Sequence, residues 1–255
     1  GNSIVMGDID GDGDLDVITD SIPPQGNVTD KPQLIIQIND GEGVFRLGPT
    51  KTVDSTVQVD EVAPIDLKIG TTKAALGLVD LNGDGKLDLI SANEGANEVQ
   101  VFTNATSNGK VTFTLAQTLT LGISGPQAVV SGDFNRDGKM DFAVANKGNK
   151  TLSVFMNNGN MNFAQTNLSP AAGAPVRLAV GDMDGDGRLE VVSANDNDTL
   201  SIFKPLGGAV QTLGAGNIPS AVAVGDLSGD GRLDIVVSLP ETGRVFVLAR
   251  NANNS

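Results

Sequence analysis

Residues 80–88 read D-L-N-G-D-G-K-L-D, and close variants of this acidic segment recur along the chain. The other copies are D-I-D-G-D-G-D-L-D, D-F-N-R-D-G-K-M-D, D-M-D-G-D-G-R-L-E and D-L-S-G-D-G-R-L-D, at residues 8–16, 133–141, 182–190 and 226–234. Five ungapped matches within 255 residues define an internal repeat. The segments are numbered loop one to loop five in chain order, and the positions within each run from 1 to 9.

Short apolar runs flank each loop, as residues 178–181 and 191–194 do for loop four. None of these runs continues with helical periodicity, so each repeat is predicted to be strand, loop, strand. A third strand is expected at residues 99–102, 152–155, 200–203 and 245–248, and a weaker fourth in places, such as 111–121. Phe102, Phe155, Phe203 and Phe246 recur in the third strands, where we expect them to pack between neighbouring repeats.

The spacing of the loops predicts an all-β propeller of four-stranded antiparallel blades. Successive loops start 72, 53, 49 and 44 residues apart, and each interval holds one blade. The long first interval predicts an insertion near residues 55–73. We expect residues 1–255 to form a single domain with five blades, the last of which lacks its outer strand. Two alternatives remain open: the chain is part of a six- or seven-bladed ring, or another chain completes the open edge through strand addition.

Composition restricts the chemistry. The formal charge is −14, which disfavours nucleic acid and anionic lipid as partners. The chain has no His, Cys, Tyr or Trp, so the commonest general base, the thiolate metal ligand and the best sugar-stacking rings are absent. No apolar run reaches the roughly 18 residues of a transmembrane segment. We expect a protein without catalytic residues or an organic cofactor, and not an enzyme.

The loops themselves predict calcium sites. In such a loop the side chains at positions 1, 3, 5 and 9, with the backbone carbonyl of position 7, form an oxygen cage that suits a hard cation. Glycine at position 6 is expected to have positive φ. The loops contain 18 of the 31 acidic residues, and five Ca²⁺ ions, one per loop, would change the formal charge from −14 to −4. The predicted metal residues are Asp8, Asp10, Asp12, Asp14 and Asp16; Asp80, Asn82, Asp84, Lys86 and Asp88; Asp133, Asn135, Asp137, Lys139 and Asp141; Asp182, Asp184, Asp186, Arg188 and Glu190; and Asp226, Ser228, Asp230, Arg232 and Asp234.

Other interpretations of the loops are weaker. An EF-hand would need Glu at position 12, where this chain has Thr19, Ser91, Val144, Ser193 or Val237. Acidic surface turns without a metal remain an alternative. Arg136 replaces the position-4 glycine and Glu190 replaces the position-9 aspartate, so the third and fourth sites are expected to be weaker.

Six N-x-[ST] sequons begin at Asn27, Asn104, Asn149, Asn167, Asn197 and Asn253. Glycosylation would require a secretory route. Because Asn, Ser and Thr are also ordinary turn and strand residues, we favour slightly the interpretation that the sequons are incidental.

The chain resembles the integrin-type FG-GAP repeat and the related VCBS repeat of β-propellers. The resemblance rests on the five loops, on residues 173–175 (G-A-P) and on the glycine that directly precedes Asp133, Asp182 and Asp226. It implies radial blades with one Ca²⁺ loop between the first and second strand of each. We therefore expect a secreted or cell-surface module for adhesion, protein interaction or assembly, with an extracellular protein, a glycan or another copy as partner. A calcium-dependent lectin is the alternative, and a metal-assisted hydrolase is less favoured.

Overall fold

The structure, a computed structural model, describes residues 3–21, 33–39, 41, 45–47, 74–107, 111–169 and 172–250. The expected insertion at 55–73 lies outside these residues. The chain divides into two compact units, Gly1–Thr120 and Leu121–Ser255, and each is described by itself. The single-domain prediction therefore stays a prediction.

The first unit contains two antiparallel sheets, each paired in chain order. The first sheet consists of β1 (Ile4–Gly7), β2 (Asp16–Ser21), β3 (Gln33–Asn39) and β4 (Phe45–Leu47). The second consists of β5 (Ala74–Val79), β6 (Asp88–Asn93), β7 (Glu98–Asn104) and β8 (Phe113–Leu119). The first strands of the two sheets, β1 and β5, are in contact, and the two sheets share one apolar core that includes Ile18, Leu76 and Leu89.

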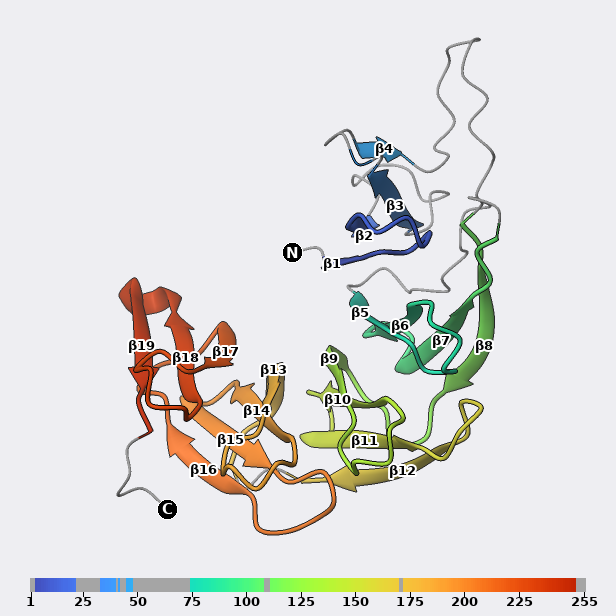
Figure 1. The fold of residues 1–255 in the computed structure, drawn as a ribbon. Helices are drawn as coiled ribbons and strands as arrows, with labels where there is room; N and C mark the ends of the chain where they lie inside the picture. The colour runs from blue at the N-terminus through green and yellow to red at the C-terminus, as the bar shows by residue number, and fades with distance from the viewer. Residues whose placement is uncertain are drawn as a thin grey trace. The chain divides into compact units, whose positions relative to one another are not determined.

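The second unit contains three further sheets. They are β9 (Pro126–Gly132), β10 (Asp141–Asn146), β11 (Thr151–Asn157) and β12 (Phe163–Leu168); β13 (Pro175–Gly181), β14 (Glu190–Asn195), β15 (Thr199–Phe203) and β16 (Gln211–Gly214); and β17 (Ala221–Gly225), β18 (Asp234–Leu239) and β19 (Arg244–Leu248). A short 3-10 helix, Pro240–Thr242, joins β18 to β19. The first strands β9, β13 and β17 lie side by side, and the later strands of each sheet lie outside them (Figure 1).

This architecture confirms the predicted fold class, an all-β propeller fold with five antiparallel blades. Four blades have four strands. The fifth has three in the described residues, which agrees with the expected short final blade. Within the described residues, no helix is long and apolar enough to cross a membrane.

The second strand of each blade forms the centre of the core. All six residues of β6, β10 and β14 are buried, because these strands are paired on both edges and covered on both faces. Small and β-branched side chains such as Ala143, Val192 and Val237 fill the layers between blades, which lets the sheets approach closely. Strands of this kind hold the intervening loops in fixed positions.

The prediction for the recurring phenylalanines is confirmed for Phe102 and Phe203, which belong to apolar clusters shared with a neighbouring blade. Phe155 is buried, but its ring contacts are with Phe142 and Phe163 of its own blade. Phe102, Phe155 and Phe203 are buried opposite Leu89, Phe142 and Val191, the residues that follow position 9 of their loops. In the fifth blade the equivalent residue is Leu248, which pairs with Ile235. Phe246 lies two residues earlier in the register and is 45% exposed, so its predicted packing role is wrong.

Candidate metal centres

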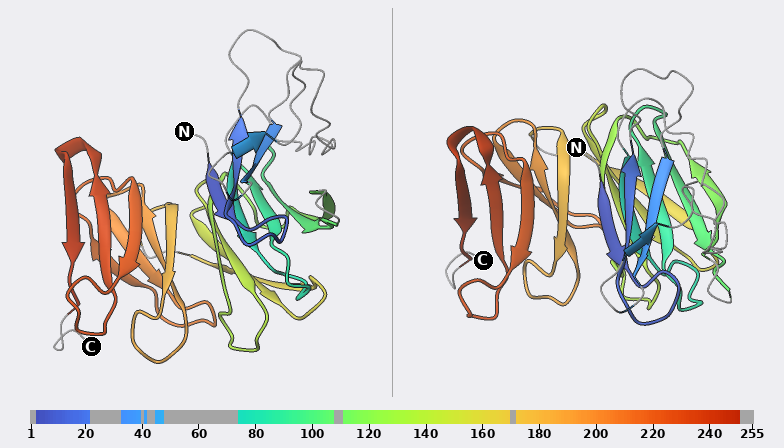
Figure 2. Two further views of the ribbon diagram at one scale, coloured as in Figure 1. Left: turned by 45° about the horizontal axis from the view of Figure 1, so that its top comes forward. Right: turned by 90° about the horizontal axis from the view of Figure 1, so that it is seen from above.

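Each acidic loop is the hairpin between the first and second strand of its blade. Position 1 directly follows the first strand, and position 9 is the first residue of the second strand. In the second unit, Figure 2 shows these three hairpins at the same end of the blades. Position 9 pairs with the residue that precedes position 1 in every blade, so the two strands hold both ends of the loop close together.

The aspartate at position 1 organises the turn through backbone N–H groups. In loop two, Asp80 accepts hydrogen bonds from the N–H groups of Gly83 at 2.7 Å, Asp84 at 3.2 Å and Gly85 at 2.8 Å. The position-6 glycine donates to position 1 in all five loops, through Gly13, Gly85, Gly138, Gly187 and Gly231. These glycines have φ between 82° and 97°, which confirms the predicted positive φ.

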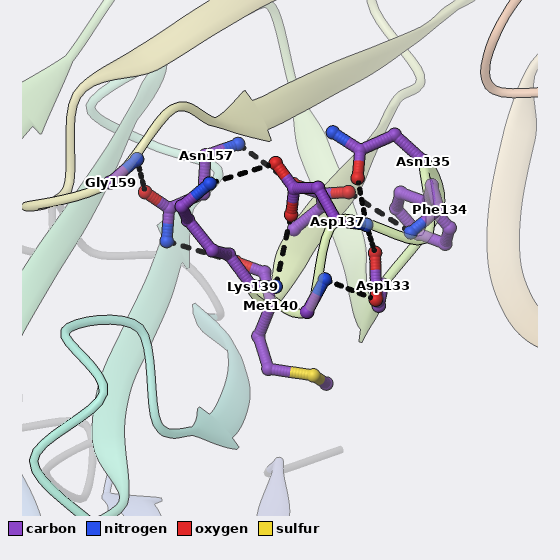
Figure 3. A network of polar contacts seen from close by, with 10 residues as sticks. Asp133, Phe134, Asn135, Asp137, Lys139, Met140, Asn157 and Gly159 are labelled. Carbon is purple, nitrogen blue, oxygen red and sulfur yellow. Dashed lines mark hydrogen bonds and ion pairs between the residues drawn. The ribbon is translucent and has the colours of Figure 1, made fainter.

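Positions 3 and 5 are held in the same way. Figure 3 shows loop three, where Asn135 accepts from the N–H of Asp137 at 2.9 Å and Asp137 accepts from the N–H of Lys139 at 2.9 Å. Each of these contacts occupies one side-chain oxygen, Oδ1. A carboxylate oxygen has two lone pairs, so the turn keeps acceptor capacity for a cation.

Position 9 holds the most buried carboxylate of each loop: Asp16, Asp88, Asp141, Glu190 and Asp234 are at most 3% exposed. In loop three, Asp141 accepts hydrogen bonds from Phe134 N–H at 2.9 Å and from Asn157 N–H at 2.7 Å. Asn157 is the last residue of the third strand, β11, and lies beyond the part of that strand that pairs with β10. The same double acceptance recurs for Asp16, Asp88 and Asp234. Position 9 therefore ties the loop to the third strand.

Sequence reasoning missed the asparagine at this contact. In each of these blades, one residue of the third strand pairs with the residue that follows position 9. Asn39, Asn104 and Asn157 lie two residues after that third-strand residue. Their side-chain oxygens accept from an N–H two residues on, and their Nδ2 groups donate to loop carbonyls. The recurring signal was present as Q-I-N, F-T-N and F-M-N.

Burial and like charge raise the pKa of several loop carboxyls. Burial is the main cause for Asp16, Asp88, Asp141 and Glu190, whose pKa values lie above the ordinary range. In loop one, burial followed by the carboxylates of Asp16 and Asp12 raises the pKa of Asp10. The pKa of Asp234 is lowered instead, because the N–H of Arg250 donates to its carboxylate.

Carboxylates converge at positions 1, 3 and 9. In loops one and four, oxygens of Asp8, Asp10 and Asp16, and of Asp182, Asp184 and Glu190, lie within 4.8 Å of one another. Oxygens that share one Ca²⁺ at about 2.3–2.6 Å can be at most about 5 Å apart, so the spacing fits calcium. Position 3 of the other loops is Asn82, Asn135 or Ser228, which also offer oxygen.

Two sets of predicted residues lie outside these triads. The position-5 aspartates Asp12 and Asp186 are not part of the close groups. At position 7, Lys86 donates from Nζ to the carbonyl of Thr106 at 2.5 Å, and Lys139 pairs with Asp137 at 3.0 Å. Arg188 and Arg232 are exposed. The Lys86 side chain therefore points to a partner outside its loop, whereas the Lys139 ammonium lies on the position-5 carboxylate of its own loop. The contribution of position 7 through its carbonyl stays a prediction.

Among the described sequons, one is buried. Asn104 is 2% exposed, and its Nδ2 donates to the carbonyl of Ile9 at 2.9 Å, so a glycan cannot be carried there in the folded chain. Asn149, Asn167 and Asn197 are exposed. Asn27 and Asn253 lie outside the described residues.

The sequence matches the family described as FG-GAP-like repeat in three overlapping segments, residues 80–144, 133–193 and 182–237. These segments cover more than half of the chain, so the chain belongs to the FG-GAP-like repeat family. The match confirms the resemblance drawn from the loops. No curated protein matches the chain in sequence.

Several solved structures share the fold. BBS1N, crystallised in complex with ARL6DN, has a TM-score of 0.55 at 14% identity, over 96% of this chain and 76% of that chain. The periplasmic gluconolactonase PpgL of Pseudomonas aeruginosa has a TM-score of 0.55 at 19% identity, over 94% and 68%. A lectin of Agrocybe aegerita that recognises non-reducing terminal N-acetylglucosamine has a TM-score of 0.51 at 20% identity, over 98% and 66%. At such identities the likeness shows the fold alone.

Proposed function

We propose that this chain is a calcium-binding β-propeller module that acts outside the cell in adhesion, protein interaction or assembly, and that it binds rather than catalyses. The observation that carries the proposal is the group of Asp8, Asp10 and Asp16. Three carboxylate oxygens converge within 4.8 Å in a loop that contains five aspartates and no Lys or Arg. Without a cation, their mutual repulsion opposes folding.

Calcium fits this role better than magnesium does. The loops offer carboxylate, amide and carbonyl oxygens in a hydrogen-bonded turn, which suits the six to eight oxygen ligands of Ca²⁺. Mg²⁺ prefers a smaller octahedral shell and keeps several waters. When bound, the cation neutralises the loop and fixes the entry to the second strand, while Asp16 and its equivalents hold the loop against the third strand.

The test is thermal unfolding in excess Ca²⁺ and after exhaustive chelation, at matched ionic strength, with a count of bound metal. Far-ultraviolet circular dichroism follows the β-structure, since Trp and Tyr are absent. Each site held at 100 times its Kd adds about 2.7 kcal/mol of stability. We expect a large loss of stability on chelation, and a smaller effect when Mg²⁺ replaces Ca²⁺. Identical curves with no bound metal would contradict the proposal.

The calcium affinity also tests the proposed location. Extracellular calcium modules have Kd values of about 10⁻⁴–10⁻³ M, whereas cytosolic sensors bind at about 10⁻⁷–10⁻⁵ M. We expect values in the weaker range, measured by isothermal titration calorimetry. Submicromolar binding at the loops would argue against a secreted or cell-surface module.

A carbohydrate ligand is the second candidate. One neighbour in fold is a lectin that recognises non-reducing terminal N-acetylglucosamine. The absence of Trp and Tyr weakens this candidate for our chain. A glycan array probed at high protein concentration in Ca²⁺ tests it, and specific binding that is lost on chelation would favour the lectin over a protein-interaction module.

A further inference from the structure

Loop four departs from the other loops at the contact with the third strand. In loops one, two, three and five, position 9 accepts a backbone N–H from Asn39, Asn104, Asn157 or Arg250. In the fourth blade Val191 pairs with Phe203, so the residue that corresponds to these four donors is Pro205. Proline has no N–H, so the second hydrogen bond to position 9 cannot form. Glu190 keeps the hydrogen bond from the position-2 N–H, here that of Met183 at 2.8 Å, which all the other loops also have.

The residue before Pro205 is a lysine that reaches into the loop. Lys204 Nζ donates to Asp184 Oδ2 at 2.6 Å, and this contact raises the pKa of Lys204 and lowers that of Asp184. Glu190 and Asp186 add to the favourable field at the ammonium. In the other blades the register places Ile38, Thr103, Met156 and Ala249 at this point, and none carries a charge. The ammonium of Lys139 in loop three pairs with Asp137 at position 5, not with the residue at position 3.

Further cations surround the same loop. Arg250 lowers the pKa of Asp184 through its charge. The guanidinium of Arg136 lies over Gly187: a Cβ built on this position-6 glycine would be 2.9 Å from Arg136 Nη1. Arg188 belongs to the loop itself. Loop four thus has positive groups next to its four carboxylates, whereas loop one has five aspartates and no basic residue.

We infer that Lys204 is the resident cation of loop four, so that this loop is stable without calcium and binds Ca²⁺ at least tenfold more weakly than the other four loops. The inference rests on the proposed calcium function and refines it. An incoming divalent ion has to displace the ammonium from Asp184, and the displaced charge stays close to the ion and repels it. The five sites are then unequal, and loop four is the weakest of them.

Lys204→Met is the direct test, because methionine holds this place in the third blade as Met156. Lys204 and Asp184 side chains are 47% and 33% exposed and line a cavity of about 540 Å³, so methionine fits without overpacking. Lys147→Met is the matched control, since it removes the same charge from an exposed turn at the opposite end of β10 from loop three.

The position-6 glycines provide one reporter for each loop. Their N–H groups donate to the position-1 carboxylate, so their amide resonances respond to calcium at their own loop. In a calcium titration of the full chain followed by NMR, we expect Gly187 to respond at tenfold or more higher Ca²⁺ than Gly138. In Lys204→Met, the Gly187 midpoint should fall about tenfold while Gly138 stays unchanged, and Lys147→Met should change neither.

A second readout separates the cation role from simple packing. After chelation, Lys204→Met should unfold at lower temperature than the parent chain, and excess calcium should remove the difference. The triple variant Glu190→Asp, Lys204→Met, Pro205→Asn copies the third blade and should give a loop four that binds as tightly as loop three.

The outcomes distinguish this inference from the proposed function. Equal midpoints for Gly187 and Gly138 in the parent chain, or a Gly187 midpoint that Lys204→Met does not lower, would overturn the inference and leave calcium binding intact. No calcium response at any of the five glycines would overturn the proposed function and the inference with it.

Discussion

Arg136 is the residue at which one loop departs from the preferred backbone conformation. It occupies position 4 of loop three with φ of 62°, where the other loops have glycine with φ between 75° and 86°. The left-handed region costs a side-chain-bearing residue about 1–2 kcal/mol, while glycine loses more chain entropy on folding. The sequence identified this position as irregular, and the structure shows that the arginine adopts the glycine conformation.

Arg136→Gly should therefore raise the free energy of unfolding by up to about 1 kcal/mol. The measurement is chemical denaturation in saturating Ca²⁺, so that the proximity of the guanidinium to loop four has little effect. The reciprocal change in loop two, Gly83→Arg, should lower stability by a similar amount. A stabilised Gly83→Arg variant would show that the backbone conformation is not the cause.

Asn104 is a residue whose role is structural although its sequence suggests glycosylation. Its buried side chain joins the Ile9 carbonyl to the Thr106 N–H, at 2.9 Å each. Asn104→Ala leaves both groups without a partner, which should destabilise the chain by about 1–3 kcal/mol. Denaturation of Asn158→Ala, an exposed turn residue, is the control and should change stability by less than about 0.5 kcal/mol. A neutral Asn104→Ala variant would contradict the bridging role.

At the scale of the element, the loop and its three strands form one unit joined at position 9. Asp16, Asp88 and Asp141 begin the second strand, accept from the N–H of position 2, and accept from the far end of the third strand. The loop is thus part of the sheet. Its charge state and the stability of the blade are linked.

The linkage predicts an unusual pH dependence without metal. Burial raises the pKa of Asp16, Asp88 and Asp141 above the ordinary value of 3.8, so the folded state favours their protonated form. Their contribution to stability is complete below about pH 4 and is lost as the pH rises through the raised pKa values. Chelated protein should therefore melt at higher temperature just above pH 4 than at pH 7.

Calcium should reverse this trend, because it binds the ionised carboxylates. Asp137, Asp184 and Asp234 have lowered pKa values and act in the opposite direction, but Asp137 and Asp184 are exposed and screened by solvent. Melting temperatures measured against pH, with chelator and with excess Ca²⁺, check the prediction. Two curves that fall in parallel on acidification would contradict it.

At the scale of the whole chain, the need for a cation differs between the loops. Loop one has no basic residue, whereas loop four is paired with Lys204 and lies beside Arg136 and Arg250. Chelation should therefore increase amide exchange first in β1 and β2, and last in β13 and β14. Hydrogen–deuterium exchange followed by mass spectrometry can resolve these strands, with calcium-loaded protein as the reference. Equal loss of protection in both blades would argue against graded dependence.

The sequence by itself determined the features that repeat locally. The nine-residue loops, the apolar runs around them and the spacing of one blade predicted an all-β propeller, and the position-6 glycines predicted their own positive φ. Periodicity is sufficient here because each feature depends on residues close together in the chain.

The tertiary structure decided everything that depends on pairing between distant segments. Strand register placed Leu248 instead of Phe246 against the core of the fifth blade, and it brought the backbone N–H groups of Asn39, Asn104 and Asn157 to the position-9 carboxylates. It buried the Asn104 sequon and placed Lys204 on Asp184, 20 residues away. A shift of one residue in register turns a side chain to the other face of its strand, so no local pattern could fix these contacts.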